Sequence, residues 1–192
     1  MPLQPFTLVG ATTRAGLISA PLRDRFVVRE HLDYYSVSEL AKIVFRSAGK
    51  LEMPMDDETA TEIAGRSRGT PRLANNRLRW VRDYSTSRAN RVVDLEIART
   101  ALEMQGIDEL GLDGFDRRYL ETLQRVFGGG PAGIEAIAHT MSTAVDTLED
   151  DVEPFLLRYE LIIRTPRGRR LTERGEAHLG DAPPSGPQQK LF

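Results

Sequence analysis

The segment LIIRTPRGRRLT, residues 161–172, predicts a β-hairpin, because an apolar run leads into a Thr-Pro-Arg-Gly turn and a short return strand. Two helices are predicted just before it, AGIEAIAHTM (132–141) and STAVDTLEDDVEPFLLRYE (142–160), with Ser142 or Thr143 capping the second. A helix pair followed by a hairpin is the winged-helix arrangement, in which the hairpin is the wing. This segment therefore decides the fold of the C-terminal part of the chain.

The wing is strongly basic. Its arginines are Arg164, Arg167, Arg169 and Arg170. Guanidinium groups gathered in one small hairpin repel each other unless an anion offsets them, and arginine matches phosphate with two parallel hydrogen bonds. We predict that the wing contacts a nucleic-acid backbone; the alternative is a solvated basic loop. The preceding helix carries Asp146, Glu149, Asp150, Asp151 and Glu153, which argues against its lying deep in a major groove.

The chain before the wing is mostly helical by pattern. Residues 36–105 predict a small all-helical unit, and residues 108–114, rich in Gly and Asp, predict the boundary to the next domain. Residues 6–13, FTLVGATT, predict a buried strand that ends in threonines and has no preceding strand to pair with, which suggests that the chain lacks its beginning. Arg72 falls in the first turn of a helix, where the dipole disfavours a cation. We therefore predict a bound anion such as a nucleotide phosphate there; the alternative is a surface arginine.

Composition excludes several classes of protein. The chain has 192 residues, a net charge of −2 and no cysteine, so disulfides and thiolate metal sites are excluded. Its three histidines are widely spaced without a metal-ligand pattern, and no apolar run is long enough for a membrane helix. A P-loop needs Gly-Lys-Ser/Thr, but Gly49 and Lys50 are followed by Leu51. We expect a cytoplasmic protein with no metal site and no membrane contact.

Three motifs occur in the order found in one family. They are FTLVGATTRAGLISAPLRDRF (6–26), RGTPRLANNRL (68–78) and RTPRGR (164–169). Together they resemble the C-terminal part of the RuvB family, AAA+ ATPases that drive Holliday junction branch migration. The resemblance implies a mainly α fold made of the remnant of an AAA+ α/β subdomain (1–30), an AAA+ helical lid (31–107), a C-terminal winged helix (108–180) and a disordered tail (181–192).

The resemblance also implies roles for single residues. Thr13 matches the sensor-1 position and Arg25 the arginine finger, which reaches the nucleotide of the neighbouring subunit. Arg72 matches sensor 2, and Tyr35 matches a position beside the nucleotide. An arginine finger supplied in trans raises the rate by about 10³–10⁵, because it meets charge that develops in the transition state.

In the wing, Arg164 and Arg169 match residues that contact the DNA backbone, and Arg167 and Arg170 belong to the same basic cluster. The implied cofactors are ATP and Mg²⁺, with the metal ligands expected upstream of this chain. The implied partners are duplex DNA or a Holliday junction, a RuvA tetramer, and identical subunits in a hexamer.

The sequence departs from the family at several points. Walker A, Walker B and the hairpin that binds RuvA are absent, Val27 stands where Gly is usual, and Ala144 and Val145 occupy a stretch that often holds an arginine. We therefore expect a fragment of a branch-migration motor that does not hydrolyse ATP by itself. The alternative is a non-enzymatic winged-helix adaptor or regulator that has lost its motor.

Overall fold

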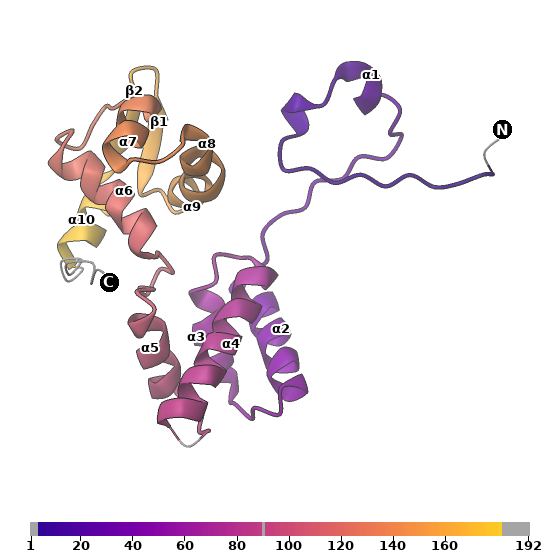
Figure 1. Cartoon of the computed structure of the whole chain (residues 1–192), viewed down its shortest axis with the longest axis vertical. Helices are drawn as coiled ribbons and strands as arrows, with labels where there is room; N and C mark the ends of the chain where they lie inside the picture. The colour runs from indigo at the N-terminus through magenta and orange to yellow at the C-terminus, as the bar shows by residue number, and fades with distance from the viewer. Residues whose placement is uncertain (1–3, 90, 182–192) are drawn as a thin grey trace. The chain divides into compact units, whose positions relative to one another are not determined.

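The computed structural model describes residues 4–89 and 91–181, and it is mainly helical, as predicted (Figure 1). The predicted tail lies almost wholly outside the described residues. Contacts divide the chain into two compact units, one ending at Asp33 and one beginning at Tyr34. None of the helices in the described ranges is long and apolar enough to cross a membrane.

The N-terminal unit contains a 3₁₀ turn, η1 (Ala15–Leu17), and one short helix, α1 (Ala20–Arg23). The strand predicted over residues 6–13 is wrong: this stretch forms no strand, and Phe6, Leu8 and Val9 are largely exposed. A strand is held by hydrogen bonds to a neighbouring strand, and none lies beside it in the described part of this unit. Residues 6–13 could form a strand only beside another strand, and the described part of this unit contains none.

Four helices form a bundle, α2 (Val37–Lys50), α3 (Asp57–Gly65), α4 (Pro71–Arg88) and α5 (Leu95–Met104). Ser36 and Glu39 form a reciprocal capping box at the start of α2, while Asp56 and Asp94 accept backbone N–H bonds at the starts of α3 and α5. The apolar faces close over one core that includes Leu40, Val44, Ile63, Leu78, Val81 and Leu102.

The winged helix follows with its own core. Its helices are α6 (Gly114–Arg125), α7 (Ile134–Met141), α8 (Val145–Thr147), the π-helical segment η2 (Leu148–Val152), α9 (Glu153–Arg158) and α10 (Glu173–Asp181). The core includes Leu112, Tyr119, Leu120, Leu123, Ile137, Leu148, Leu156 and Ile162. The cap predicted at Ser142 or Thr143 is wrong, because Ser142 takes a left-handed conformation that ends α7, and Ala144 precedes α8.

The wing consists of β1 (Ile162–Thr165) and β2 (Gly168–Leu171), paired antiparallel with Arg164 opposite Arg169. Ala132, just before α7, forms a bridge to Arg169, with backbone N···O distances of 2.9 and 2.7 Å. Since a two-stranded hairpin alone is marginal, this third backbone segment helps to fix the wing on the domain.

Buried arginines join the bundle to the winged helix. Arg68 Nε donates to Gly111 O at 2.8 Å, and the Arg68 guanidinium pairs with the buried Asp116 carboxylate of α6. Arg77 Nη2 also donates to Gly111 O at 3.2 Å, and burial, followed by the charge of Arg68, lowers the Arg77 pKa to about 10. In return, Arg158 Nη2 of α9 donates to Arg68 O at 2.7 Å. The two parts of this unit are therefore held by charged and polar contacts that are buried or partly buried.

Gly111 lies at the centre of this joint, and we predict that it tolerates no side chain. Its φ is +86°, and an added Cβ would overlap the carbonyl of Arg66. Gly106 is a matched control, with φ of +73° and open space around it. Gly106→Ala should cost about 1–2 kcal/mol of unfolding free energy through backbone strain, and Gly111→Ala about 1–3 kcal/mol more through the forced shift. Urea unfolding measures both; equal losses would contradict the close packing.

Candidate nucleic-acid interface

Two arginines of the wing, one half-exposed and one mostly buried, pair with one buried carboxylate. Arg164 and Arg169 face each other across the strands, where like charges repel. Between them lies the carboxylate of Glu153, the first residue of α9, which has no exposed surface. Arg164 Nε donates to Glu153 Oε2 at 2.9 Å, and Arg169 Nε donates to Glu153 Oε1 at 2.8 Å. The buried anion turns a repulsive cross-strand pair into a bridged one.

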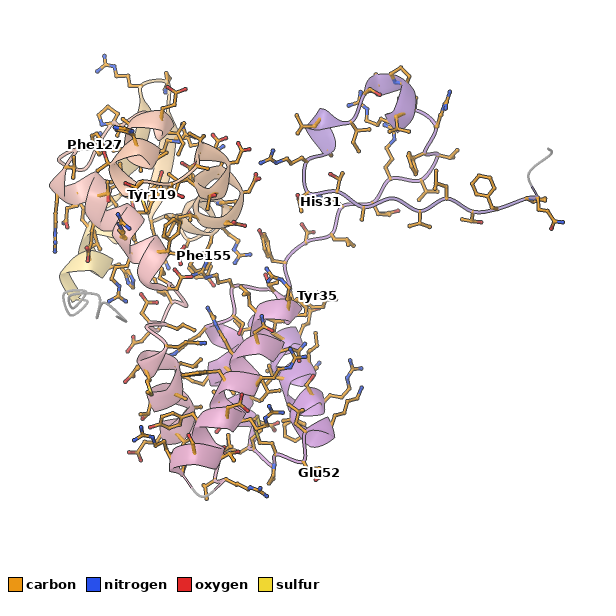
Figure 2. The ribbon with its side chains drawn as sticks, viewed as in Figure 1. His31, Tyr35, Glu52, Tyr119, Phe127 and Phe155 are labelled. Atoms are coloured by element: carbon orange, nitrogen blue, oxygen red, sulfur yellow. The ribbon has the colours of Figure 1, made fainter. Side chains whose placement is uncertain are left out.

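Tyr119 of α6, labelled in Figure 2, is the third partner of Glu153. Its hydroxyl donates to Glu153 Oε1 at 2.8 Å. Burial would raise the pKa of Glu153, but hydrogen bonds from Arg169, Tyr119 and Arg164 outweigh it and leave the pKa lowered. Burial, and then the Glu153 charge, raise the pKa of Tyr119, so the phenol stays a donor. Because the folded pKa of Glu153 is the lower one, its ionisation stabilises the fold above the unfolded pKa, and this contribution is lost as the pH falls.

The other two wing arginines face outward. Arg167, in the turn, and Arg170, on β2, are exposed, and neither guanidinium has an ion-pair partner among the described residues. A hollow of about 350 Å³ lies beside the turn; it is lined by Gly133, Ile134, Glu135, Thr165, Pro166, Arg167, Gly168 and Arg169. The wing therefore has a paired inner set and an unpaired outer set of cations.

The second helix of the pair is acidic, as the sequence predicts. Its described carboxylates include Asp146, Glu149, Asp150 and Asp151. Glu149 lies in η2, one turn before Glu153, and its Oε1 accepts a bond from Arg169 Nη2 at 2.7 Å. This helix thus supplies the counter-charge to the wing.

Thr13 and Arg25 both lie in the N-terminal unit and are exposed. Thr13 precedes η1, where the neighbouring Thr12 Oγ1 accepts a bond from Arg14 N at 3.0 Å. Arg25 follows α1, and the carboxylate beside it, Asp24, pairs with Arg29 at 3.3 Å. The Arg25 guanidinium has no ion pair within the described residues.

In the second unit, Tyr35 is bonded to the turn that leads to Arg72. The backbone N–H of Tyr35 donates to Gly69 O at 3.0 Å, three residues before Arg72 (Tyr35 is labelled in Figure 2). Arg72 is the second residue of α4 and is exposed, with no ion pair among the described residues. An unpaired cation in the first turn of a helix fits contact with an external anion. The described residues bring no three His, Asp or Glu side chains together as a metal site.

Sequence reasoning missed the residues that hold the wing. Glu153 reads as one of five acids on a solvated helix, and Tyr119 as an ordinary core aromatic. A usable signal was present: Glu153 is flanked by Val152 and Phe155, both buried, whereas Asp150 and Asp151 are exposed. An acid on the apolar side of an amphipathic helix requires a buried cation.

The comparisons with known proteins cover most of the chain. Three family models match: the Holliday junction DNA helicase RuvB P-loop domain over residues 1–32, the RuvB AAA lid domain over 35–108 and the RuvB C-terminal winged helix domain over 109–180. The subunit named "Holliday junction branch migration complex subunit RuvB" from Rhodopirellula baltica is 58% identical over 185 residues, 96% of this chain and 50% of that protein. The subunit of the same name from Parafrankia is 53% identical over 183 residues, 95% of this chain and 52% of that protein.

A solved structure is also similar to most of this chain. The Thermotoga maritima RuvB Holliday junction branch migration motor is similar with a TM-score of 0.88 and 44% identity, over 95% of this chain and 61% of that chain. The chain spans about half the length of the curated relatives it matches.

Removing the Tyr119 hydroxyl tests how much its bond to Glu153 contributes to stability. Tyr119→Phe removes one donor from a buried carboxylate, so the unfolding free energy should fall by about 1.5–3 kcal/mol at neutral pH. Tyr159→Phe is the matched control, because the Tyr159 hydroxyl has no hydrogen bond among the described residues. Urea denaturation compares the two; a loss no larger for Tyr119 than for Tyr159 would show that the bond contributes nothing to stability.

Proposed function

This chain belongs to the RuvB family, as its sequence predicted, and we propose that it forms the lid and the DNA-contacting part of an ATP-driven Holliday junction branch-migration motor. The observation that carries this proposal is the wing, where Arg167 and Arg170 are exposed and unpaired on a hairpin whose other two arginines are bridged to the domain. Such a surface suits the phosphate backbone of duplex DNA and reads no base sequence. The proposed partners are a four-way junction, a RuvA tetramer and identical subunits in a hexamer in the cytoplasm.

The nucleotide-facing role rests on four residues. Arg72 and Tyr35 fit the near side of an ATP site, since the guanidinium is unpaired and the tyrosine is fixed to the same turn. When bound, ATP supplies the driving force through hydrolysis of its γ-phosphate bond. In our proposal Arg72 contacts phosphate within its own subunit, Thr13 orients the attacking water or the γ-phosphate, and Arg25 reaches the site of the neighbouring subunit. We assign no magnesium ligand, since the described residues contain no suitable cluster.

The presence of the N-terminal motif favours a motor subunit over an adaptor. Residues 1–32 match the RuvB P-loop domain model, and this stretch contains both Thr13 and Arg25. The role proposed for Arg25, contact with the nucleotide of another subunit, serves ATP hydrolysis and has no function in an adaptor that only binds DNA. We propose the division of the chain into an ATPase edge (1–30), a lid (31–107) and a winged helix (108–180) on the same grounds.

The DNA contact is tested by fluorescence anisotropy of this chain with labelled duplex and four-way-junction DNA at several salt concentrations. Arg167→Ala and Arg170→Ala should each weaken binding, and each should reduce the slope of log K against log salt by about one. Arg46→Ala is the matched control, because it removes an equal charge from an exposed position on α2. Equal effects at Arg46 and in the wing would contradict a wing-specific contact.

The catalytic assignment predicts that this chain does not turn over ATP by itself, because it contains no P-loop. Phosphate release from the purified chain, with Mg²⁺ and DNA present, should match a blank without protein. The Arg25→Ala variant should give the same result. Turnover above the blank that survives Arg25→Ala would overturn both the inactivity and the role of Arg25.

A further inference from the structure

The two carboxylates that hold Arg169 differ in their surroundings. Glu153 has no exposed surface and accepts bonds from Tyr119, Arg164 and Arg169. Glu149 keeps 40% of its side chain exposed, and its one hydrogen bond is to Arg169 Nη2, at 2.7 Å. Breaking the contacts of Glu153 would leave a buried charge without a partner. Breaking the contact of Glu149 with Arg169 only returns a half-exposed carboxylate to water. Glu149 is therefore the replaceable partner of Arg169.

The replaceable contact is the one to the partner that solvent reaches. Arg169 Nε donates to the buried Glu153 Oε1 at 2.8 Å, and Nη2 donates both to Glu153 Oε2 at 3.3 Å and to Oε1 of the half-exposed Glu149 at 2.7 Å. A carboxylate and a phosphate both present oxygen acceptors that suit the guanidinium edge. The position that Glu149 Oε1 occupies is thus one that a phosphate oxygen could take without moving Glu153.

We propose that Glu149 is an internal phosphate surrogate, which occupies the outer edge of Arg169 in the free protein and is exchanged for a DNA phosphate on binding. This inference rests on the proposed DNA contact of the wing. Glu153 acts as the positioning residue, since it holds the inner edge of the guanidinium before and after the exchange. Each binding event must break the contact between Glu149 and Arg169, so Glu149 weakens DNA binding, which suits a motor that has to release its track repeatedly.

The test compares two neutral variants of the same helix. Glu149→Gln removes the competitor, and Asp151→Asn removes one negative charge from an exposed neighbour that has no partner among the described residues. Both variants lower the general repulsion of DNA, but only the first removes the ion pair between Glu149 and Arg169 Nη2; the bond from Nη2 to Glu153 Oε2 remains. In fluorescence anisotropy with labelled duplex DNA, Glu149→Gln should bind about two- to fivefold more tightly than Asp151→Asn, the range expected for a half-exposed ion pair.

Repeating the comparison in a variant that lacks Arg169 tests whether the effect of Glu149→Gln depends on its contact with that arginine. In Arg169→Gln the outer edge is missing, so Glu149→Gln and Asp151→Asn should then have equal effects on the dissociation constant. If the unsubstituted chain binds no duplex DNA, the proposed wing contact itself fails. If it binds and the two variants have equal effects in both backgrounds, the exchange is overturned while the wing contact stands. A persistent advantage of Glu149→Gln without Arg169 would also overturn it.

Discussion

A carboxylate without exposed surface requires a positive charge within the protein, and Arg164 and Arg169 on the two strands of the wing provide it for Glu153. The arginines in turn require the carboxylate. Arg164 and Arg169 stand opposite each other in the hairpin and would push its strands apart without an anion between them. A one-residue register shift of either strand would turn its arginine away from Glu153 and leave the carboxylate with one cation fewer. The buried charge therefore fixes the strand register and the direction in which the wing projects.

A second buried charge pair does the same between the bundle and the winged helix. Arg68 pairs with Asp116, and its own carbonyl receives the bond from Arg158, whose guanidinium also stacks on the ring of Tyr34 at 3.8 Å. Arg68 stands four residues before Arg72, in the turn that Tyr35 also holds. Any movement of this turn has to carry α6 and α9 with it or break buried bonds. If the turn faces a nucleotide and the wing contacts DNA, as proposed, these bonds couple the two sites mechanically.

Local features of the fold followed from the sequence, and the long-range ones did not. The start of the helical unit at residue 36, with Ser36 or Ser38 as its predicted cap, and the hairpin turn at residues 165–168 depend on neighbours within four residues, so their signals lie in the local sequence. The strand expected over 6–13 depends on partner strands, which pattern alone cannot supply. The partners of Glu153 lie 11, 16 and 34 residues away, and Asp116 lies 48 residues from Arg68. Nothing in the spacing of these residues indicates that they meet.

Charge is segregated within the winged helix, although the whole chain is close to neutral at −2. If the second helix entered a major groove, its carboxylates would lie within one Debye length, about 8 Å at physiological salt, of the DNA phosphates. That repulsion would oppose the attraction of the wing, whereas in contact through the wing edge two of these acids, Glu149 and Glu153, bind Arg169 instead. The contact that we propose involves no base recognition in the groove and only the backbone, which every duplex sequence offers equally. The proposed branch-migration motor requires contact of this kind, because it has to advance along DNA of any sequence.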